Sequence, residues 1–490
     1  MMDFRFDAST HAAVVLALVV AVCASCTSED AEPTLPSSTG TAGAAGAGAG
    51  GSGGEASTGG AGGQGGVGPA PMGPLTVHPG NPRYFADPSG QPVYVASTYG
   101  GNSLQDQAEI ATFDWSQYVD LLDQHELNLA KYVIRDRCEN HGTISPTLYA
   151  RTGPGQASDG GLKFDLDQID PEFITQLRGR TADLESRGVY VVVMFFNRFD
   201  VVSGAGSWGA SAYNAANNVN GIDGDTNGDG EGREVQTLPL APAVEQLERA
   251  RVRAIIDAVN EYDNVIYEVC NETYGDSAWQ EWVTTEIRDY QAGLPKQHLV
   301  GQTATWPDGS NADLFASTAD WISPERDNGS NSDYEDDPPV QDGSKIVIVD
   351  SDHVTAGEKC TPTQVWSYFT TGAHPMCYEG WDINREATHD AMRDTRSYAR
   401  RMDLVNALPS DSLASTGYAL AVPGAEYLVF QPSAGAFSLD LDAGSYAYEW
   451  FEVTAGAVRQ QGNVTAPGGD MDFDPPFDGQ AVLYLVASTR

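Results

Sequence analysis

Strand-like and helix-like segments alternate along the chain from Pro74 to about Leu408. Short apolar runs rich in β-branched and aromatic residues, bounded by Gly, Pro, Asn or Asp, predict β-strands. Segments whose apolar residues recur every three or four positions predict helices. The predicted strands are residues 93–97, 129–134, 190–196, 265–270, a short run near 299, 321–323, 346–349 and 375–378.

The segment between the third and fourth predicted strands is the clearest helix. Its apolar residues recur at helical spacing with charged residues opposite: Val244, Leu247, Val252, Ile255, Ile256 and Val259. A later helix is expected at 278–292. Eight strands connected by helices over this length predict a (β/α)8 TIM barrel in residues 74–408.

The last eighty residues have a different period. Short strands are predicted at 427–430, 437–441, 446–451 and 481–486, separated by turn residues such as Pro423-Gly424. Closely spaced strands with Gly- and Pro-rich turns are typical of a small antiparallel β-sandwich. We therefore expect a second domain in residues 409–490.

The first 73 residues predict where the protein is located. The apolar run at 12–24 is too short to span a bilayer and ends in small residues before Cys26. Residues 1–26 resemble a bacterial lipoprotein signal with lipidation at Cys26, which implies an exported outer-membrane or cell-surface lipoprotein. The alternative is a secretory signal that releases the protein. Residues 27–73 are mainly Gly, Ala, Ser and Thr, the composition of a flexible, disordered tether.

The chain is strongly acidic, with 68 Asp and Glu against 27 Lys and Arg and a net charge of −41. Such a charge argues against nucleic acid and against an anionic membrane surface as partners. It suits a neutral substrate, and it leaves a lipid anchor as the one expected link to a membrane. Solubility or adaptation to salt would also account for the acidic excess.

Four cysteines follow the signal: Cys138, Cys270, Cys360 and Cys377. Export permits disulfides, and four cysteines allow three connectivities. The favoured pair is Cys360 with Cys377, because it closes a short loop. These four cysteines include no Cys-x-x-Cys spacing of the kind used for zinc or redox chemistry.

Carboxylates follow two of the predicted barrel strands. Asn271 and Glu272 come at the end of the strand at 265–270, and Asp350 and Asp352 follow the strand at 346–349. The C-terminal ends of barrel strands carry catalytic residues, and two carboxylates about 5 Å apart are what retaining glycoside hydrolysis requires. The alternative is that Asp350 and Asp352 cap the next helix or bind a cation.

Aromatic residues fall in loops expected on the same face of the barrel. Trp208 follows the third strand, Trp306 the fifth, and Tyr378 and Trp381 the eighth. Flat aromatic rings can stack on sugar rings, so all four are predicted substrate contacts. Trp381 is the strongest candidate platform.

The long loop after the third strand contains an independent motif. Asp223, Asp225, Asn227 and Glu234 match the calcium-binding pattern D-x-[DN]-x-[DN]-G-x5-E, and Asp229 adds another acid. We expect a structural calcium site there, with an active-site lid or a solvated turn as the alternative. No other cofactor is expected.

Several passages together resemble a known group of exported bacterial proteins: VHPGNPRYFADPSGQPVYVAS, DNVIYEVCNE, ADWISPERDN, SKIVIVDSDH and RMDLVNALPSDSLASTGYALAVPGAEYLVF. That family combines a cellulase-like or apiosidase-like barrel of the clan A glycoside hydrolases with a C-terminal module labelled as a collagen-binding domain of a collagenase. The resemblance covers nearly everything after the tether.

The resemblance implies roles for individual residues. Glu272 would be the acid/base, and Asn271 would bind the 2-hydroxyl of the sugar. Asp352 occupies the position of the nucleophile, where relatives usually have Glu; Asp350 and Glu379 are the other candidates. Arg135, at the end of the second strand, would hold the nucleophile ionised.

The expected function is therefore that of an exported, surface-tethered glycoside hydrolase acting on a neutral oligo- or polysaccharide by a two-carboxylate, retaining mechanism. The alternative is a non-catalytic surface protein with a degenerate barrel that binds carbohydrate or collagen. A protease is not supported, because the folded part has no His-Glu-x-x-His run and no serine elbow. The sandwich is expected either to steady the barrel or to bind collagen.

Overall fold

The computed structural model describes residues 73–488, except 102, 108–112, 139–143, 205, 307–308, 326–341, 355–359 and 380–384. The predicted signal, the tether, Cys26 and Trp381 lie outside the described residues. Among the residues that are described, no helix combines the length and apolar character needed to cross a bilayer.

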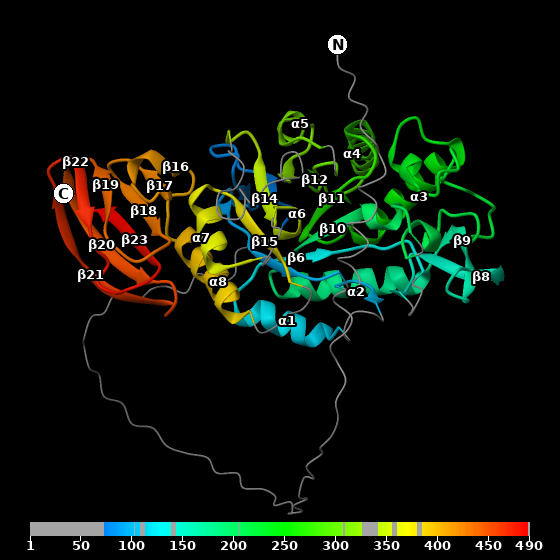
Figure 1. Ribbon diagram of the computed structural model, residues 1–490, viewed down its shortest axis with the longest axis horizontal. Helices are drawn as coiled ribbons and strands as arrows, with labels where there is room; N and C mark the ends of the chain where they lie inside the picture. The colour runs from blue at the N-terminus through cyan, green and yellow to red at the C-terminus, as the bar shows by residue number, and fades with distance from the viewer. Residues whose placement is uncertain are drawn as a thin grey trace, which may run out of the picture. The chain divides into compact units, whose positions relative to one another are not determined.

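Eight parallel strands close into a barrel, as the sequence predicts (Figure 1). In chain order they are β4 (Ser97–Tyr99), β6 (Leu129–Tyr132), β10 (Tyr190–Asn197), β11 (Val265–Asn271), β12 (Val300–Thr303), β13 (Trp321–Ser323), β14 (Ile346–Asp350) and β15 (His374–Tyr378). Each strand pairs with its neighbours in the chain order of the barrel, and β15 pairs with β4 to close it. This is the (β/α)8 TIM-barrel topology.

The first barrel strand begins four residues later than predicted. Val93 was expected in the barrel but belongs to a small antiparallel sheet. That sheet consists of β1 (Thr76–Val77), β2 (Phe85–Ala86) and β3 (Pro92–Val93). Phe85 packs in the cluster of residues that fills the barrel interior. The small sheet therefore covers the end of the barrel opposite the predicted catalytic face.

The helices lie outside the strands (Figure 1). They are α1 (Trp115–Gln124), α2 (Pro171–Ser186), α3 (Pro242–Val259), α4 (Ser277–Gln291), α5 (Asn311–Ala316), α6 (Ser351–Val354), α7 (Pro362–Thr370) and α8 (Glu386–Ala399). Three of them begin with proline, which suits the first helical position. Between β4 and α2 the chain also forms β5 (Asp106–Gln107), β7 (Ile144–Ser145), β8 (Tyr149–Gln156) and β9 (Leu162–Ile169). β5 pairs with β7 in a two-stranded antiparallel sheet, and β8 and β9 form a hairpin.

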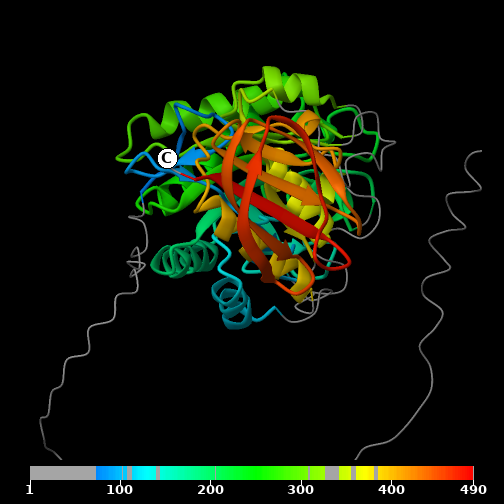
Figure 2. The same cartoon turned by 90° about the vertical axis from the view of Figure 1, so that its left-hand side faces the viewer.

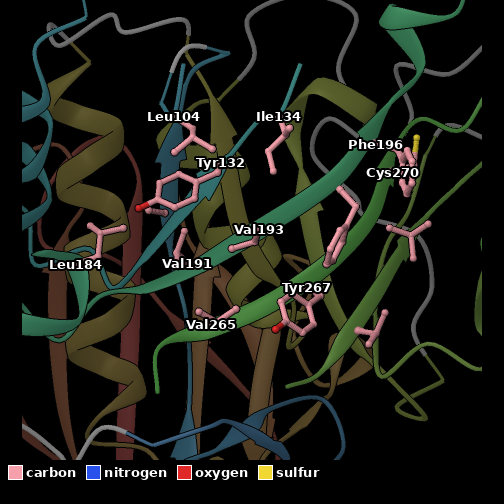
Figure 3. Packing of buried hydrophobic residues seen from close by; sticks show 14 of the residues in the cluster. Leu104, Tyr132, Ile134, Leu184, Val191, Val193, Phe196, Val265, Tyr267 and Cys270 are labelled. Carbon is pink, nitrogen blue, oxygen red and sulfur yellow. The ribbon is translucent and has the colours of Figure 1, made fainter. Parts of the chain in front are cut away.

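Neighbouring residues of the barrel strands face opposite sides. Val192 of β10 and Ile266 of β11 belong to the interior cluster. Val191 and Val265, one position away, belong to the cluster that includes helix residues such as Leu184 (Figure 3). Both faces of these strands are thus buried, which explains why they read as nearly continuous apolar runs.

The C-terminal domain is a sandwich of a six-stranded and a two-stranded antiparallel sheet (orange to red in Figure 2). The larger sheet has the order β16-β17-β18-β23-β20-β21, and β19 pairs with β22. The strands are β16 (Leu408–Pro409), β17 (Ala419–Val422), β18 (Glu426–Gln431), β19 (Phe437–Leu441), β20 (Gly444–Glu452), β21 (Ala457–Ala466), β22 (Gly469–Phe473) and β23 (Ala481–Ala487). The sequence predicted β18, β19, β20 and β23, whose inward positions are apolar. It did not predict β21, because that strand is polar and largely exposed.

One face of the larger sheet packs on the barrel. Leu428 and Phe430 of β18 belong to the same hydrophobic cluster as Trp366 of α7, whereas Tyr427 and Val429 face the sandwich core. The ring of Trp366 stacks on Phe430 with a centroid distance of 6.2 Å and an interplanar angle of 21°. These contacts support the expectation that the sandwich steadies the barrel.

We predict that Trp366→Ala lowers the free energy of unfolding by ~3–5 kcal/mol, because Trp366 is fully buried between the domains. Urea denaturation would measure the change. The control is Trp282→Ala on α4, a partly buried ring, for which we expect a loss of ~1–2 kcal/mol. Equal losses for the two variants would contradict the claim that the domains share a core at Trp366.

Candidate active site

Glu272 lies at the C-terminal end of β11, where the sequence placed it. Its backbone has a φ of +50°, a left-handed conformation that only one other non-glycine residue, Glu126, adopts among the described residues. For an L-residue this conformation costs ~1–2 kcal/mol. Such strain persists only where surrounding contacts enforce it, and it is concentrated at functional sites.

Two neighbouring residues hold Glu272 in this position. Its backbone N–H donates to Oγ1 of Thr303 at 3.0 Å, and that hydroxyl donates to the carbonyl of Cys270 at 2.7 Å. Nη2 of Arg198 donates to the Glu272 carboxylate at 2.8 Å. Glu272 is 7 % exposed, so the carboxylate has limited access to solvent and a defined orientation.

Arg198 is itself held between two aromatic rings. Its guanidinium carbon is 4.0 Å from the ring centre of Trp306 and 4.5 Å from that of Phe199. Trp306, a predicted sugar platform, therefore contacts the arginine that binds Glu272. Its role as a direct sugar contact stays a prediction.

A buried ion cluster lies below the candidate site, inside the barrel. Nζ of Lys131 is 3.0 Å from Glu268 and 3.0 Å from Asp350, and all three side chains are fully buried. The Tyr99 hydroxyl donates to Asp350 at 2.6 Å. These residues come from β4, β6, β11 and β14, so the cluster ties together strands that are distant in the sequence.

The charges in this cluster compensate one another. Burial alone would lower the pKa of Lys131, but the two carboxylates raise it above its usual value. Burial would likewise raise the pKa of Asp350, yet the Lys131 ammonium and His353 hold it below its usual value. For Glu268 burial prevails, and its pKa is raised in spite of Lys131. Of the two carboxylates beside Lys131, Asp350 is thus the more acidic.

Asn271 is oriented by the residues around its side-chain oxygen. Nε2 of His353 is 3.0 Å from Oδ1 of Asn271, and Nδ1 of the same ring is 3.0 Å from the Ser323 hydroxyl. Lys131 donates weakly to the same oxygen at 3.5 Å. An amide oxygen only accepts hydrogen bonds, so His353 is the donor, and the amide nitrogen of Asn271 is left to donate elsewhere.

The candidate nucleophiles differ in accessibility. Asp350 has a fully buried side chain that is used by Lys131 and Tyr99. The Glu379 side chain, 2 % exposed, contacts His389 at 2.6 Å and accepts from Thr98 at 2.7 Å. Asp352 lies in the first turn of α6, directly after β14, and is only partly buried. Of the three carboxylates, Asp352 is the most exposed.

Arg135 follows β6 and lies in a separate cluster of charges. Its guanidinium is 3.8 Å from Asp200, and Arg137 is 3.4 Å from the same carboxylate. Asp200 also accepts from the backbone N–H of Asp136 at 3.2 Å. Asp200 is not one of the candidate nucleophiles, so this ion pair does not test the predicted interaction of Arg135 with the nucleophile. That interaction stays a prediction.

The prediction for Trp208 is wrong. Trp208 is 4 % exposed, and Gly224 and Gly232 lie against its ring so closely that a Cβ on either would contact it at 3.0 Å or less. A ring enclosed in this way offers no face to a sugar. Tyr378 is partly exposed and lies against Tyr99, with a centroid distance of 5.3 Å, so it remains available as a substrate contact.

The predicted calcium loop folds largely on its own hydrogen bonds. Asp225 accepts from the backbone N–H groups of Gly228, Asp229 and Gly230 at 2.6–3.1 Å. Within the described ranges, no group of three or more His, Cys, Asp or Glu side chains is arranged to hold a metal ion. Calcium binding by Asp223, Asp225, Asn227, Asp229 and Glu234 stays a prediction.

Cys360 and Cys377, the pair favoured from the sequence, are joined in a disulfide with a Cα–Cα distance of 5.8 Å. Cys138 and Cys270 are buried free thiols. Because Cys377 lies in β15, the bond ties the segment before α7 to the eighth barrel strand.

Several residues of the site were not predicted. Lys131 and Glu268 stood in the sequence as single charges within apolar strands, which signals a buried ion pair. Arg198 and Phe199 directly follow the third strand, so the rule used for Glu272 could have found them. His353 could not be assigned, because its contact with Asn271 joins positions 82 residues apart.

Comparison with known proteins supports the fold. No protein-family model matches this chain, and no curated protein does. A solved structure titled "Glycoside hydrolase" is 13 % identical, with a TM-score of 0.57 over 85 % of this chain and 98 % of its own. A glycoside hydrolase family 5 protein from Bacteroides vulgatus ATCC 8482 is 13 % identical, with a TM-score of 0.56 over 85 % of this chain and 94 % of its own. The chain thus has a fold found in glycoside hydrolases.

Burial and the neighbouring Asp136 carboxylate raise the pKa of Asp200 from 3.8 to about 7, despite Arg135 and Arg137. Between about pH 4 and pH 7, Asp200 therefore keeps its proton in the folded state and loses it in the unfolded chain. The free energy of unfolding falls as the pH rises through this range. We predict that Asp200→Asn reduces the difference in the free energy of unfolding between pH 4.5 and pH 7.5 by ~1–3 kcal/mol.

Urea denaturation at the two pH values tests this prediction. Asp313→Asn, which changes an exposed carboxylate on α5, is the control and should leave the difference unchanged. The same pH dependence in wild type and Asp200→Asn would show that Asp200 does not bind the extra proton.

Proposed function

We propose that this protein is a glycoside hydrolase that cleaves a neutral oligo- or polysaccharide. The observation that carries the proposal is the strained backbone of Glu272 at the C-terminal end of a barrel strand, with its amide held by Thr303 and its carboxylate by Arg198. Strain maintained at this position is best explained by a need to present the carboxyl group to a substrate.

The proposed mechanism uses two carboxylates from different strands. Asp352 attacks the anomeric carbon while Glu272 transfers its proton to the leaving oxygen. Water then displaces Asp352, and Glu272 accepts the proton of that water. Asp352 is chosen over Asp350 and Glu379 because its side chain is only partly buried, whereas the other two are almost completely enclosed.

Asn271 binds the sugar in this proposal. His353 and Lys131 occupy its side-chain oxygen, so its amide nitrogen can donate to a sugar hydroxyl. A donor fixed in this way loses little conformational entropy on binding, which favours a defined orientation of the ring.

The expected location completes the proposal. Lipidation at Cys26 would anchor the protein at the cell surface, and residues 27–73 would hold the catalytic domain away from the membrane. The net charge of −41 disfavours acidic polysaccharides. The sandwich is assigned a structural role on the basis of its contacts with α7 and α8.

We predict that Asp352→Asn lowers hydrolysis by a factor of roughly a thousand or more without changing the urea midpoint, because a nucleophile is lost from a partly exposed position. A panel of plant and bacterial polysaccharides would identify the substrate, and reducing-sugar release would measure the rate.

Asp350→Asn is the matched comparison. It removes one of the two carboxylates that pair with buried Lys131, so we expect it to lower the free energy of unfolding by ~3–5 kcal/mol. Near-native turnover by Asp352→Asn would refute the assignment of the nucleophile. Wild-type binding of a polysaccharide without hydrolysis would favour a non-catalytic binding protein.

A further inference from the structure

Phe199 is exposed in a region where its neighbours are buried. It is 38 % exposed, whereas Arg198 and Asp200 beside it are 7 % and 1 % exposed. Among the described residues, no other Phe, Tyr or Trp is exposed to this extent. Phe199 thus presents an exposed ring directly beside Arg198, the residue that binds the Glu272 carboxylate.

The backbone of Phe199 is fixed on both sides. Its N–H donates to Oδ1 of Asn197 at 2.9 Å, and its carbonyl accepts from Nη1 of Arg137 at 3.2 Å. The residue belongs to a short 3-10 helix, η1 (Arg198–Asp200), directly after β10. The ring is therefore exposed on a rigid support, and it does not need to be ordered when a ligand binds.

One side of the Phe199 ring is already in contact with the protein. The Arg198 guanidinium lies over the ring at 4.5 Å, so the 38 % of Phe199 that is exposed lies away from this contact, on the side called here the outer face. The same guanidinium donates to Glu272 at 2.8 Å. A molecule lying on the outer face of Phe199 is thus separated from the acid/base carboxylate by the ring and a single arginine.

We infer that the outer face of Phe199 is a stacking platform for a sugar ring of the substrate. This inference rests on the proposed function. The apolar C–H face of a pyranose is flat and uncharged, and its hydroxyl groups project at the edge of the ring. It can cover the phenyl ring while its hydroxyls stay in water or reach polar side chains of the site.

The physical gain is the removal of apolar surface from water. Contact would remove the exposed part of the phenyl ring and a similar area of the sugar's C–H face from water, together on the order of 100 Å². That area contributes ~1.5–3 kcal/mol to binding, which corresponds to about tenfold to a hundredfold in affinity. The platform therefore sets substrate affinity, whereas Glu272 and Asp352 perform the chemistry. Because no charged group of the ligand is required, the platform selects neutral sugars.

Calorimetric titration tests the inference. Cellohexaose, mannohexaose, xylohexaose and arabinohexaose are titrated into the full chain carrying Glu272→Gln, which prevents turnover. In that background, Phe199→Ala should weaken binding of the tightest ligand by about tenfold to a hundredfold. Phe199→Trp, which restores a flat ring, should stay within about threefold of the parent.

Leu162→Ala is the control, because Leu162 is exposed to a similar extent, 52 %, but lies on the β8–β9 hairpin. It should leave the affinity unchanged. Unchanged affinity in Phe199→Ala, or an absence of binding for all four hexasaccharides, would overturn the inference.

Kinetics separate this inference from the proposed function. With Glu272 intact, Phe199→Ala should raise KM and leave kcat within about threefold, since the loss is one of uniform binding. A fall in kcat at constant affinity would show that Phe199 only supports Arg198, which contradicts the platform. If the wild-type protein binds a hexasaccharide without hydrolysing it, the proposed function fails, although a weaker affinity in Phe199→Ala would still support the platform.

Discussion

The Lys131 ammonium, buried between Glu268 and Asp350, is the interaction on which the arrangement of this site depends. Buried charges are costly unless each is paired and hydrogen-bonded. Lys131 can satisfy its charge only if β6, β11 and β14 meet in one register inside the barrel. Arg135, Asn271 and Asp352 lie at or just beyond the ends of these strands, so the interior ion cluster sets the geometry of the residues above it. Loss of Lys131 would leave Glu268 and Asp350 without their cation. It would destabilise the barrel and displace the residues at the ends of β6, β11 and β14.

The candidate site repeats this pairing of charges nearer the surface. Arg198 binds Glu272, and Arg135 and Arg137 approach Asp200. Both of these carboxylates therefore have a cation beside them, although the chain as a whole carries a large excess of acid. Asp352, in the first turn of α6, is more exposed than Asp350 and Glu379. The combination of one strained, immobilised carboxyl group and one accessible carboxylate is consistent with a division of roles between acid/base and nucleophile.

The barrel could be predicted from the sequence because both faces of its strands are buried. This burial produces apolar runs that end abruptly in Asn271-Glu272 and Asp350. It was insufficient where a property depends on neighbours from other elements. Trp208 looked like a sugar platform, but the glycines that let the protein close around its ring, Gly224 and Gly232, are distant from it in the chain. The reverse applies to Phe199, an ordinary apolar residue in the sequence whose exposure follows from the support of Asn197 and Arg137. Polar edge strands such as β21 also lack the apolar alternation on which strand prediction depends.

The central claim is that Glu272 is the acid/base of a retaining glycoside hydrolase, and chemical rescue tests it most directly. The variant Glu272→Ala is assayed on a dinitrophenyl glycoside of the substrate sugar, whose leaving group departs without protonation, in the presence and absence of sodium azide. We expect slow turnover without azide and a rate restored by azide, with formation of a glycosyl azide of retained configuration, because azide displaces Asp352 without needing a base. Wild-type turnover by Glu272→Ala, or an azide product of inverted configuration, would contradict this role of Glu272.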